Sequence, residues 1–296
     1  MSWRLRALTM SMRLFAKPRL RRTREPQNAF RDFERAAPLL FSRPRGLRHA
    51  VEQGPPRLNW YSVGPVRDDA LVFFVHGGAF VCGNGHSYAA LAGRLSQRSG
   101  MRVCLPEYRL LQEAPFPAAT EDLRTAWEAV CARGHDPSRI AIAGDSAGGN
   151  LALTLLWQLL AEGIRPAAFL GFSPWADLTL SGESLSTNRR ADPILPRERM
   201  EEVIARYLNG ADPSDPRCSP LLAAFPDPPP ALIQVGAEEI LLSDAERMAE
   251  KLGAELTVWP GCPHVWQIFD PRLPEARAAM KQAGRFLQTS FDAAMR

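Results

Sequence analysis

Short apolar runs alternate with helical stretches from Ala70 onward, and this alternation restricts the fold more than any other feature. Candidate strands lie at 71–75, 102–105, 139–143, 168–172, 232–235 and 255–259, and candidate helices at about 87–99, 120–133, 149–162, 243–252 and 274–289. Continuous apolar strands separated by helices are typical of parallel strands that helices cover on both faces. The sequence therefore predicts an α/β fold with a mostly parallel central sheet flanked by helices.

Two regions interrupt this alternation: residues 1–50, and residues from about 177 to 220, where helical character is confined to about 197–208. Both regions are polar and rich in arginine, so we expect them to lie together as a helical cap over the carboxyl edge of the sheet. We divide the chain into an N-terminal cap segment, 1–50, and an α/β domain, 51–296, with a cap insertion at about 177–220.

The charge of the chain is concentrated at its N-terminus. Residues 1–50 hold 13 Lys and Arg against three Asp and Glu, whereas the remaining residues hold 23 against 29. A basic arm can contact an anionic membrane or a nucleic acid, and this one also resembles an organelle targeting segment. No aromatic-interleaved motif accompanies the charge, so we expect a solvated cap and no nucleic-acid partner.

No part of the sequence is suited to cross a membrane. The longest apolar run, Leu151 to Ala161, has 11 residues, which is too short for a transmembrane segment. Arginines near the start interrupt any apolar core of a signal peptide. The five cysteines are scattered without a C-x-x-C pair, which favours a reducing compartment, so we expect a cytoplasmic protein.

The segment Gly144–Gly149 has the sequence G-D-S-A-G-G and lies between the apolar run 140–143 and a helical stretch. A G-x-S-x-G motif in this setting raises a serine hydroxyl above the sheet in a strained turn, where it can act as a nucleophile. The residues two before and two after the serine must be small, since a β-carbon would collide with neighbouring backbone. A phosphate-binding loop is the alternative, but no lysine follows and the G-x-G-x-x-G spacing is absent. We therefore expect Ser146 to be a nucleophile.

A serine hydroxyl needs a base to take its proton, and histidine is the usual base. Where a G-x-S-x-G turn carries the nucleophile, the acid and the base follow the serine in the chain. His264 is the only histidine C-terminal to Ser146. The acid orients the imidazole and should follow the penultimate strand, where Glu238, Glu239 and Asp244 lie. We expect Glu239, which is close to the strand end; Asp244, which has helix-cap character, is the alternative, and Glu238 is expected to be solvated.

A glycine turn lies about 70 residues before the serine, where the strand 73–75 runs into His76. Acyl transfer needs backbone N–H groups aimed at the developing oxyanion. We expect Gly77, Gly78 and Ala79 to supply an oxyanion hole together with Ala147, which follows the nucleophile. We expect His76 to brace the turn; His76 and His86 have no third ligand beside them, so we expect no metal.

Five landmarks occur together in the chain: His76–Phe80, Glu107–Leu110 with Pro115–Ala118, Gly144–Asn150, Ser173–Leu178, and Pro263-His264. From about Leu71 to the C-terminal helix they resemble the bacterial hormone-sensitive-lipase family of α/β-hydrolases. The resemblance implies an α/β-hydrolase fold, hydrolysis of carboxylic esters without a cofactor through an acyl-serine, a cap built from the N-terminal segment, and a structural role for Tyr108-Arg109. Two departures stand out: Ala79 replaces the usual third glycine, and Glu239 replaces the usual aspartate.

We therefore expect a serine carboxylic-ester hydrolase (a carboxylesterase) whose partner is a small-molecule ester with a small or medium acyl chain; a homodimer is left open. An amidase, formamidase or deacetylase with the same triad remains an alternative, because the bond cleaved depends on how the pocket holds the leaving group. The fold also permits a non-hydrolytic receptor or a dehydratase, which the intact Ser146 and His264 disfavour.

Overall fold

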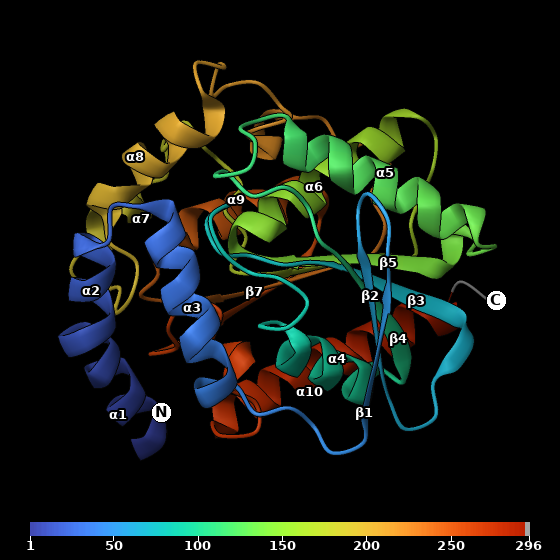
Figure 1. Cartoon of the computed structure of the whole chain (residues 1–296), viewed down its shortest axis with the longest axis horizontal. Coiled ribbons are helices and arrows are strands. Elements are labelled where there is room, and N and C mark those ends of the chain that lie inside the picture. The colour runs from blue at the N-terminus through green and yellow to red at the C-terminus, as the bar shows by residue number, and fades with distance from the viewer. Residues whose placement is uncertain (294–296) are drawn as a thin grey trace.

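A single mixed sheet organises the protein (Figure 1). The computed structural model describes residues 1–293, and within them eight strands pair in the order β1-β2-β4-β3-β5-β6-β7-β8. The strand β2 is antiparallel to β1 and β4, and the other neighbours are parallel. The strands are β1 (Leu47–Glu52), β2 (Leu58–Val63), β3 (Arg67–Val75), β4 (Met101–Pro106), β5 (Ile140–Asp145), β6 (Ala168–Phe172), β7 (Ala231–Gly236) and β8 (Glu255–Trp259). The predicted α/β fold with a mostly parallel sheet is confirmed.

The central strands are apolar throughout because both faces of the sheet are covered. On β3, Leu71, Phe73 and Val75 belong to the hydrophobic cluster on one face, whereas Val72 and Phe74 belong to the cluster on the other face. Side chains alternate between the two faces of a strand, so a run without polar residues is what a doubly covered strand requires.

Helices form a layer on each face of the sheet (Figure 1). One layer holds α4 (Ala89–Ser99) and α10 (Pro274–Ala293), which pack against each other, and the other holds α5 (Ala118–Ala132), α6 (Ser146–Ala161) and α9 (Leu242–Leu252). All five helices were expected from the sequence. Both α4 and α9 end at a glycine with positive φ, Gly100 and Gly253, which is the usual way to stop a helix.

A group of helices lies at the left of Figure 1, beside the sheet. It comprises α1 (Trp3–Ser11), the π-helical turn η1 (Met12–Ala16), α2 (Lys17–Arg22), α3 (Pro26–Leu40), α7 (Ser184–Thr187) and α8 (Arg197–Leu208). Hydrogen bonds join its N-terminal and internal parts: the Lys17 ammonium donates to the carbonyl of Asp192 (2.6 Å), and the Arg199 guanidinium donates to the carbonyl of Thr23 (2.8 Å). The sheet begins at Leu47, so β1 crosses the boundary expected at residue 50.

Three short 3₁₀ helices complete the described chain: η2 (Pro137–Arg139), η3 (Pro220–Leu222) and η4 (Trp266–Phe269). Among residues 1–293, no helix combines the length and the apolar character that crossing a bilayer requires.

Candidate active site

The candidate residues lie on four loops at the carboxyl edge of the sheet. Gly78 and Ala79 follow β3, Ser146 follows β5, Glu239 follows β7 and His264 follows β8. Parallel strands end at one edge of a sheet, and crevices outside the carboxyl ends are where open α/β sheets bind ligands. The topology thereby collects residues from distant parts of the chain at one place.

Ser146 occupies a strained turn, as the motif predicts. Its φ is +53°, a left-handed conformation that is uncommon for residues other than glycine, and its N-terminal position on α6 puts it directly after β5. A β-carbon on Gly144 would lie 2.5 Å from the carbonyl oxygen of Gly148, and one on Gly148 would lie 2.2 Å from that of His76. The expectation that small residues must flank the serine is confirmed.

The structure brings Ser146, His264 and Glu239 into one hydrogen-bonded chain. The Oγ of Ser146 lies 2.8 Å from Nε2 of His264, and Nδ1 of His264 lies 2.6 Å from Oε2 of Glu239. The other carboxylate oxygen, Oε1, accepts hydrogen bonds from the Gly236 N–H (2.6 Å) and the Ser173 hydroxyl (2.7 Å). Glu239 is fully buried, and these two donors hold one oxygen so that the other faces the imidazole.

The surroundings of His264 favour its protonated form. Burial alone would lower its pKa, but the charge of Glu239 and the hydrogen bond to it outweigh burial and raise the pKa of His264. Asp192 and Asp145 act in the same direction from farther away. A more basic imidazole takes the serine proton more readily, so the geometry suits His264 to general-base chemistry.

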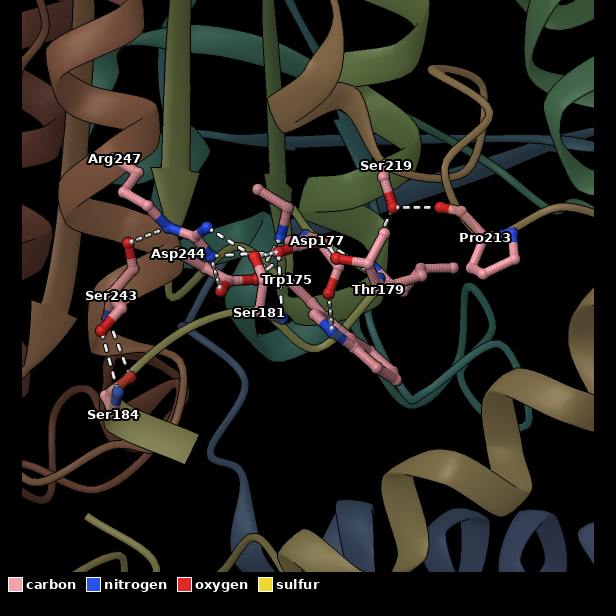
Figure 2. A network of polar contacts seen from close by, with 12 residues as sticks. Trp175, Asp177, Thr179, Ser181, Ser184, Pro213, Ser219, Ser243, Asp244 and Arg247 are labelled. Atoms are coloured by element: carbon pink, nitrogen blue, oxygen red, sulfur yellow. Dashed lines mark hydrogen bonds and ion pairs between the residues drawn. The ribbon is translucent and has the colours of Figure 1, made fainter. Parts of the chain in front are cut away.

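Asp244 belongs to a separate polar network (Figure 2). Its Oδ2 accepts hydrogen bonds from the N–H groups of Ala176 and Asp177, both at 3.0 Å, and its Oδ1 pairs with the Arg247 guanidinium at 3.1 Å. Burial is the main cause that raises the pKa of Asp244 to about 7. The expected capping role is wrong: Leu241 is the N-cap of α9, and the carboxylate anchors the loop after β6 instead.

Glu238 also differs from the expectation that it is merely solvated. Its carboxylate accepts a hydrogen bond from the N–H of Gly261 (2.7 Å), three residues before His264. The contact tethers the loop that carries the histidine to the loop that carries Glu239.

The glycine turn after β3 presents backbone donors to the site, with one correction. Gly78 and Ala79 line the cavity beside Ser146, and no acceptor within residues 1–293 takes their N–H groups. The N–H of Ala147, in the first turn of α6, has no acceptor within its helix. Gly77 was expected to be a donor as well, but its N–H donates to Oδ1 of Asp145 at 2.8 Å, so it is already occupied.

Asp145 and Ser173 are residues of this site that the sequence did not reveal, and Asp145 contacts the donor turn. It is buried, and while Oδ1 holds Gly77, Oδ2 accepts a hydrogen bond from the Tyr88 hydroxyl at 2.9 Å. Burial is the main cause that raises the pKa of Asp145 to about 6. The carboxylate next to the nucleophile thus fixes the position of the donor turn. Its place in the motif was visible, but its partners 57 and 68 residues away were not.

His76 braces the same turn, as expected. Its Nδ1 lies 2.9 Å from the carbonyl oxygen of Gly77, its own carbonyl accepts from the Tyr108 hydroxyl at 2.7 Å, and the two rings stack 4.4 Å apart. Burial lowers the pKa of His76 to about 4, so the ring is neutral at pH 7. Arg109 pairs with Asp122 at 2.8 Å, away from Ser146, in line with a structural role for this motif.

A cavity of about 310 Å³ opens beside Ser146 and His264. The N-terminal helices and α8 contribute much of its wall, which is mostly apolar: Met12, Leu20, Ala29, Phe33, Met200 and Val203. A pocket that is mostly apolar with a few convergent polar groups is typical of small-molecule sites.

Comparisons with known proteins agree with this geometry. A family model described as "alpha/beta hydrolase fold" matches residues 72–268. The chain is 40% identical to an acetyl-hydrolase of Streptomyces hygroscopicus over 77% of this chain and 79% of that protein, and 37% identical to an esterase of Acinetobacter venetianus over 75% of each.

Solved structures give the same result over nearly the whole chain. An esterase from the bacterial hormone-sensitive lipase family superposes with a TM-score of 0.91 at 34% identity, covering 98% of this chain and 99% of that chain. EstE5, in a crystal soaked with p-nitrophenyl butyrate, superposes with a TM-score of 0.91 at 31% identity, covering 99% of this chain and 100% of that chain.

Fold and site together define a hydrolase whose sheet edge carries a serine, a histidine and a carboxylate in hydrogen-bond contact. The chain belongs to the α/β hydrolase family, and the predicted resemblance to bacterial hormone-sensitive-lipase esterases is confirmed. It is an enzyme of the carboxylic-ester hydrolase class.

Proposed function

We propose that this chain hydrolyses carboxylic esters with small or medium acyl groups through an acyl-enzyme at Ser146. The observation that carries the proposal is the relay from Glu239 through His264 to Ser146, which ends at an apolar cavity beside the open N–H groups of Gly78 and Ala79.

In the first half-reaction, Nε2 of His264 takes the proton of Ser146 while Oγ forms a bond to the ester carbonyl carbon. The carbonyl π electrons move to the oxygen, and the N–H groups of Gly78, Ala79 and Ala147 stabilise this oxyanion. The tetrahedral species collapses, the bond to the alkoxy oxygen breaks, and His264 returns its proton to the leaving alcohol.

In the second half-reaction, a water molecule gives one proton to His264 and its oxygen adds to the acyl carbon. Collapse breaks the bond between the carbon and Oγ, and the proton on His264 returns to Ser146. A carboxylic acid leaves and the enzyme is regenerated. Throughout, Glu239 stabilises the imidazolium and holds it in the productive orientation.

Two observations support a small or medium acyl group. The cavity of about 310 Å³ lies at the lower end of the usual range for small-molecule pockets. The related protein from Streptomyces hygroscopicus is named an acetyl-hydrolase.

A series of p-nitrophenyl esters from acetate to palmitate, run beside the matching p-nitroanilides, tests the proposal. We expect kcat/KM to be highest for short and medium esters and very low for the anilides, with Ser146→Ala as the blank. Absence of ester hydrolysis by folded protein, or a preference for anilides, would overturn it.

We further propose that the N-terminal segment and the region of α7 and α8 form the cap that selects the acyl group. Ala29 on α3 lines the cavity, so Ala29→Phe is expected to shift the preference toward shorter esters. The matched control is Leu39→Phe on the same helix, where the side chain is 76% exposed and outside the cavity lining. An unchanged preference in Ala29→Phe would contradict a selecting cap.

A further inference from the structure

The outer face of α1 and η1 carries large apolar side chains that the protein leaves uncovered. Trp3, Met10, Leu14 and Phe15 are 74, 64, 62 and 72% exposed. The first three are seven and four residues apart, the spacing at which side chains share one face of a helix. Single apolar residues are ordinary on a protein surface, whereas several large ones exposed on one helical segment mark an interaction surface.

The other side of the same segment is packed onto the protein body. Leu5 is fully buried, and Met12 lines the cavity. The Ser2 backbone N–H and hydroxyl donate to the Glu275 carboxylate at 2.6 and 2.9 Å. The segment is thus apolar on its inner and its outer face, although only the inner face has a protein partner within the described chain.

A basic hollow lies next to this apolar row, where α2 approaches the loop before α8. It has a volume of about 510 Å³ and is lined by Arg13, Lys17, Arg21, Arg189, Arg190 and Asp192. The single carboxylate is turned inward, because Asp192 accepts hydrogen bonds from the backbone N–H groups of Ile194, Leu195 and Ile240. Arg21 pairs with Glu198, whose charge also acts on Arg189. Within residues 1–293, the guanidinium groups of Arg189 and Arg190 form no hydrogen bond or ion pair, so these two can contact an anion.

We propose that the row Trp3, Met10, Leu14 and Phe15, together with the basic hollow, is a docking face for the surface of a membrane that contains anionic phospholipid. Apolar side chains of an interfacial helix enter the boundary between headgroups and acyl chains, and neighbouring cations contact the lipid phosphates. Trp is especially suited to this boundary.

The charge of the docking face favours this occupant over the alternatives. The basic hollow is lined by five cationic side chains and one carboxylate, so two copies of the face would repel each other. A nucleic acid would use the cations but would leave the apolar row in water. An anionic bilayer is the partner that uses both the cations and the apolar side chains.

Co-sedimentation of the full chain with vesicles tests the docking face. Vesicles are made of phosphatidylcholine alone or of equal parts phosphatidylcholine and phosphatidylglycerol. We expect binding to the mixed vesicles and its loss as NaCl rises, because the Debye length falls from about 10 Å at 0.1 M to about 3 Å at 1 M. Replacing Trp3, Met10, Leu14 and Phe15 by Ser is expected to weaken partitioning roughly 100-fold, and Arg189→Gln with Arg190→Gln roughly 30-fold.

Two matched controls remove the same chemistry elsewhere. Val51, Leu222 and Val258 are 43, 49 and 42% exposed outside the docking face, and their change to Ser is expected to leave partitioning unchanged. The second control, Arg48→Gln with Arg102→Gln, removes two charges from another basic hollow and is also expected to leave partitioning unchanged. These arginines are on β1 and β4, and both strands lie apart from α1 and α2 in Figure 1. Each variant is checked for wild-type hydrolysis of a water-soluble ester.

Three results would overturn the proposal. The first is failure of the wild-type chain to bind the mixed vesicles. The second is full binding by the Ser variant of the apolar row, which would indicate a general attraction to polyanions, nucleic acid included. The third is a dimer of the wild-type chain in sedimentation velocity that the same variant converts to a monomer, which would assign the face to a second copy.

Discussion

Replacing Glu239 with glutamine is expected to disable the enzyme through the tautomer of His264. The Gly236 N–H and the Ser173 hydroxyl both donate to Oε1 of Glu239, whereas Oε2 faces Nδ1 of His264 at 2.6 Å. A glutamine keeps its carbonyl oxygen toward the fixed N–H donor, so its NH₂ group faces Nδ1. An NH₂ group accepts no proton, so the imidazole places its proton on Nε2, where it cannot deprotonate Ser146.

We expect kcat for a p-nitrophenyl ester to fall roughly 10³–10⁴-fold, the size of the loss when a carboxamide replaces the orienting carboxylate of a serine protease. KM is expected to change little, because the residue does not line the cavity. The variant also loses the charge that raises the pKa of His264, so burial dominates and this pKa falls. The pH at which any residual kcat/KM reaches half of its maximum is therefore expected to be lower than in the wild type.

Asp244→Asn is the matched control, since it makes the same change at a buried carboxylate nearby in sequence. It is expected to keep kcat within about threefold while costing about 1 kcal/mol of unfolding free energy, because Arg247 loses a charged partner. Stopped assays with p-nitrophenyl butyrate and urea unfolding of each variant measure both quantities. A catalytically dead, fully folded Asp244→Asn beside an active Glu239→Gln would refute the assignment.

An organophosphonate is expected to add one mass increment to the peptide that contains Ser146, as peptide mass spectrometry checks; labelling elsewhere would refute that role. Gly148→Ala places a β-carbon 2.2 Å from the His76 carbonyl oxygen, so urea unfolding should show a loss of about 1–3 kcal/mol. Ala79→Gly relieves a φ of +55° and should raise the unfolding free energy by about 1 kcal/mol; a lower melting temperature would contradict this. Burial raises the pKa of Asp145 to about 6, so the charged carboxylate lowers the unfolding free energy above that pH and this penalty fades toward pH 4. Asp145→Asn has no such titration, so urea unfolding at pH 4 and pH 8 should show the difference between variant and wild type moving in favour of the variant by up to about 3 kcal/mol; a difference that does not change with pH would contradict this.

The parallel strands of the sheet could be predicted because burial on both faces forces each of them to be apolar throughout. The strands β1 and β2 were both missed. The strand β2 is mostly buried, but Asn59 and Ser62 interrupt its apolar residues. The strand β1 was missed because it is largely exposed. Four of the six residues of β1 are exposed, and Arg48 and His49 are among them, so this edge strand has no apolar run. Strand pairing sets its conformation, and pairing is a long-range property that local composition does not carry.

The site shows the same division between local and long-range information. Ser146, Glu239 and His264 could be predicted because each follows a strand that its own neighbourhood identifies. Ser173 and Asp145 could not, since their partners are 66 and 68 residues away. Gly77 was assigned to the oxyanion hole because it belongs to the glycine turn at the end of a strand, and only the three-dimensional contact with Asp145 shows that its N–H is already hydrogen-bonded.

The contact between the turn that carries Ser146 and the glycine turn after β3 also limits how this sequence can evolve. Gly148 rests against the backbone of His76, and Asp145 ties Gly77 to the elbow, so a change on one side obstructs the other. The cavity wall on α3 and α8 has no such backbone constraint at Ala29 or Val203. We therefore expect single substitutions in these helices to change substrate preference, and substitutions at the packed turns to be poorly tolerated. A directed-evolution library is best concentrated on α3 and α8.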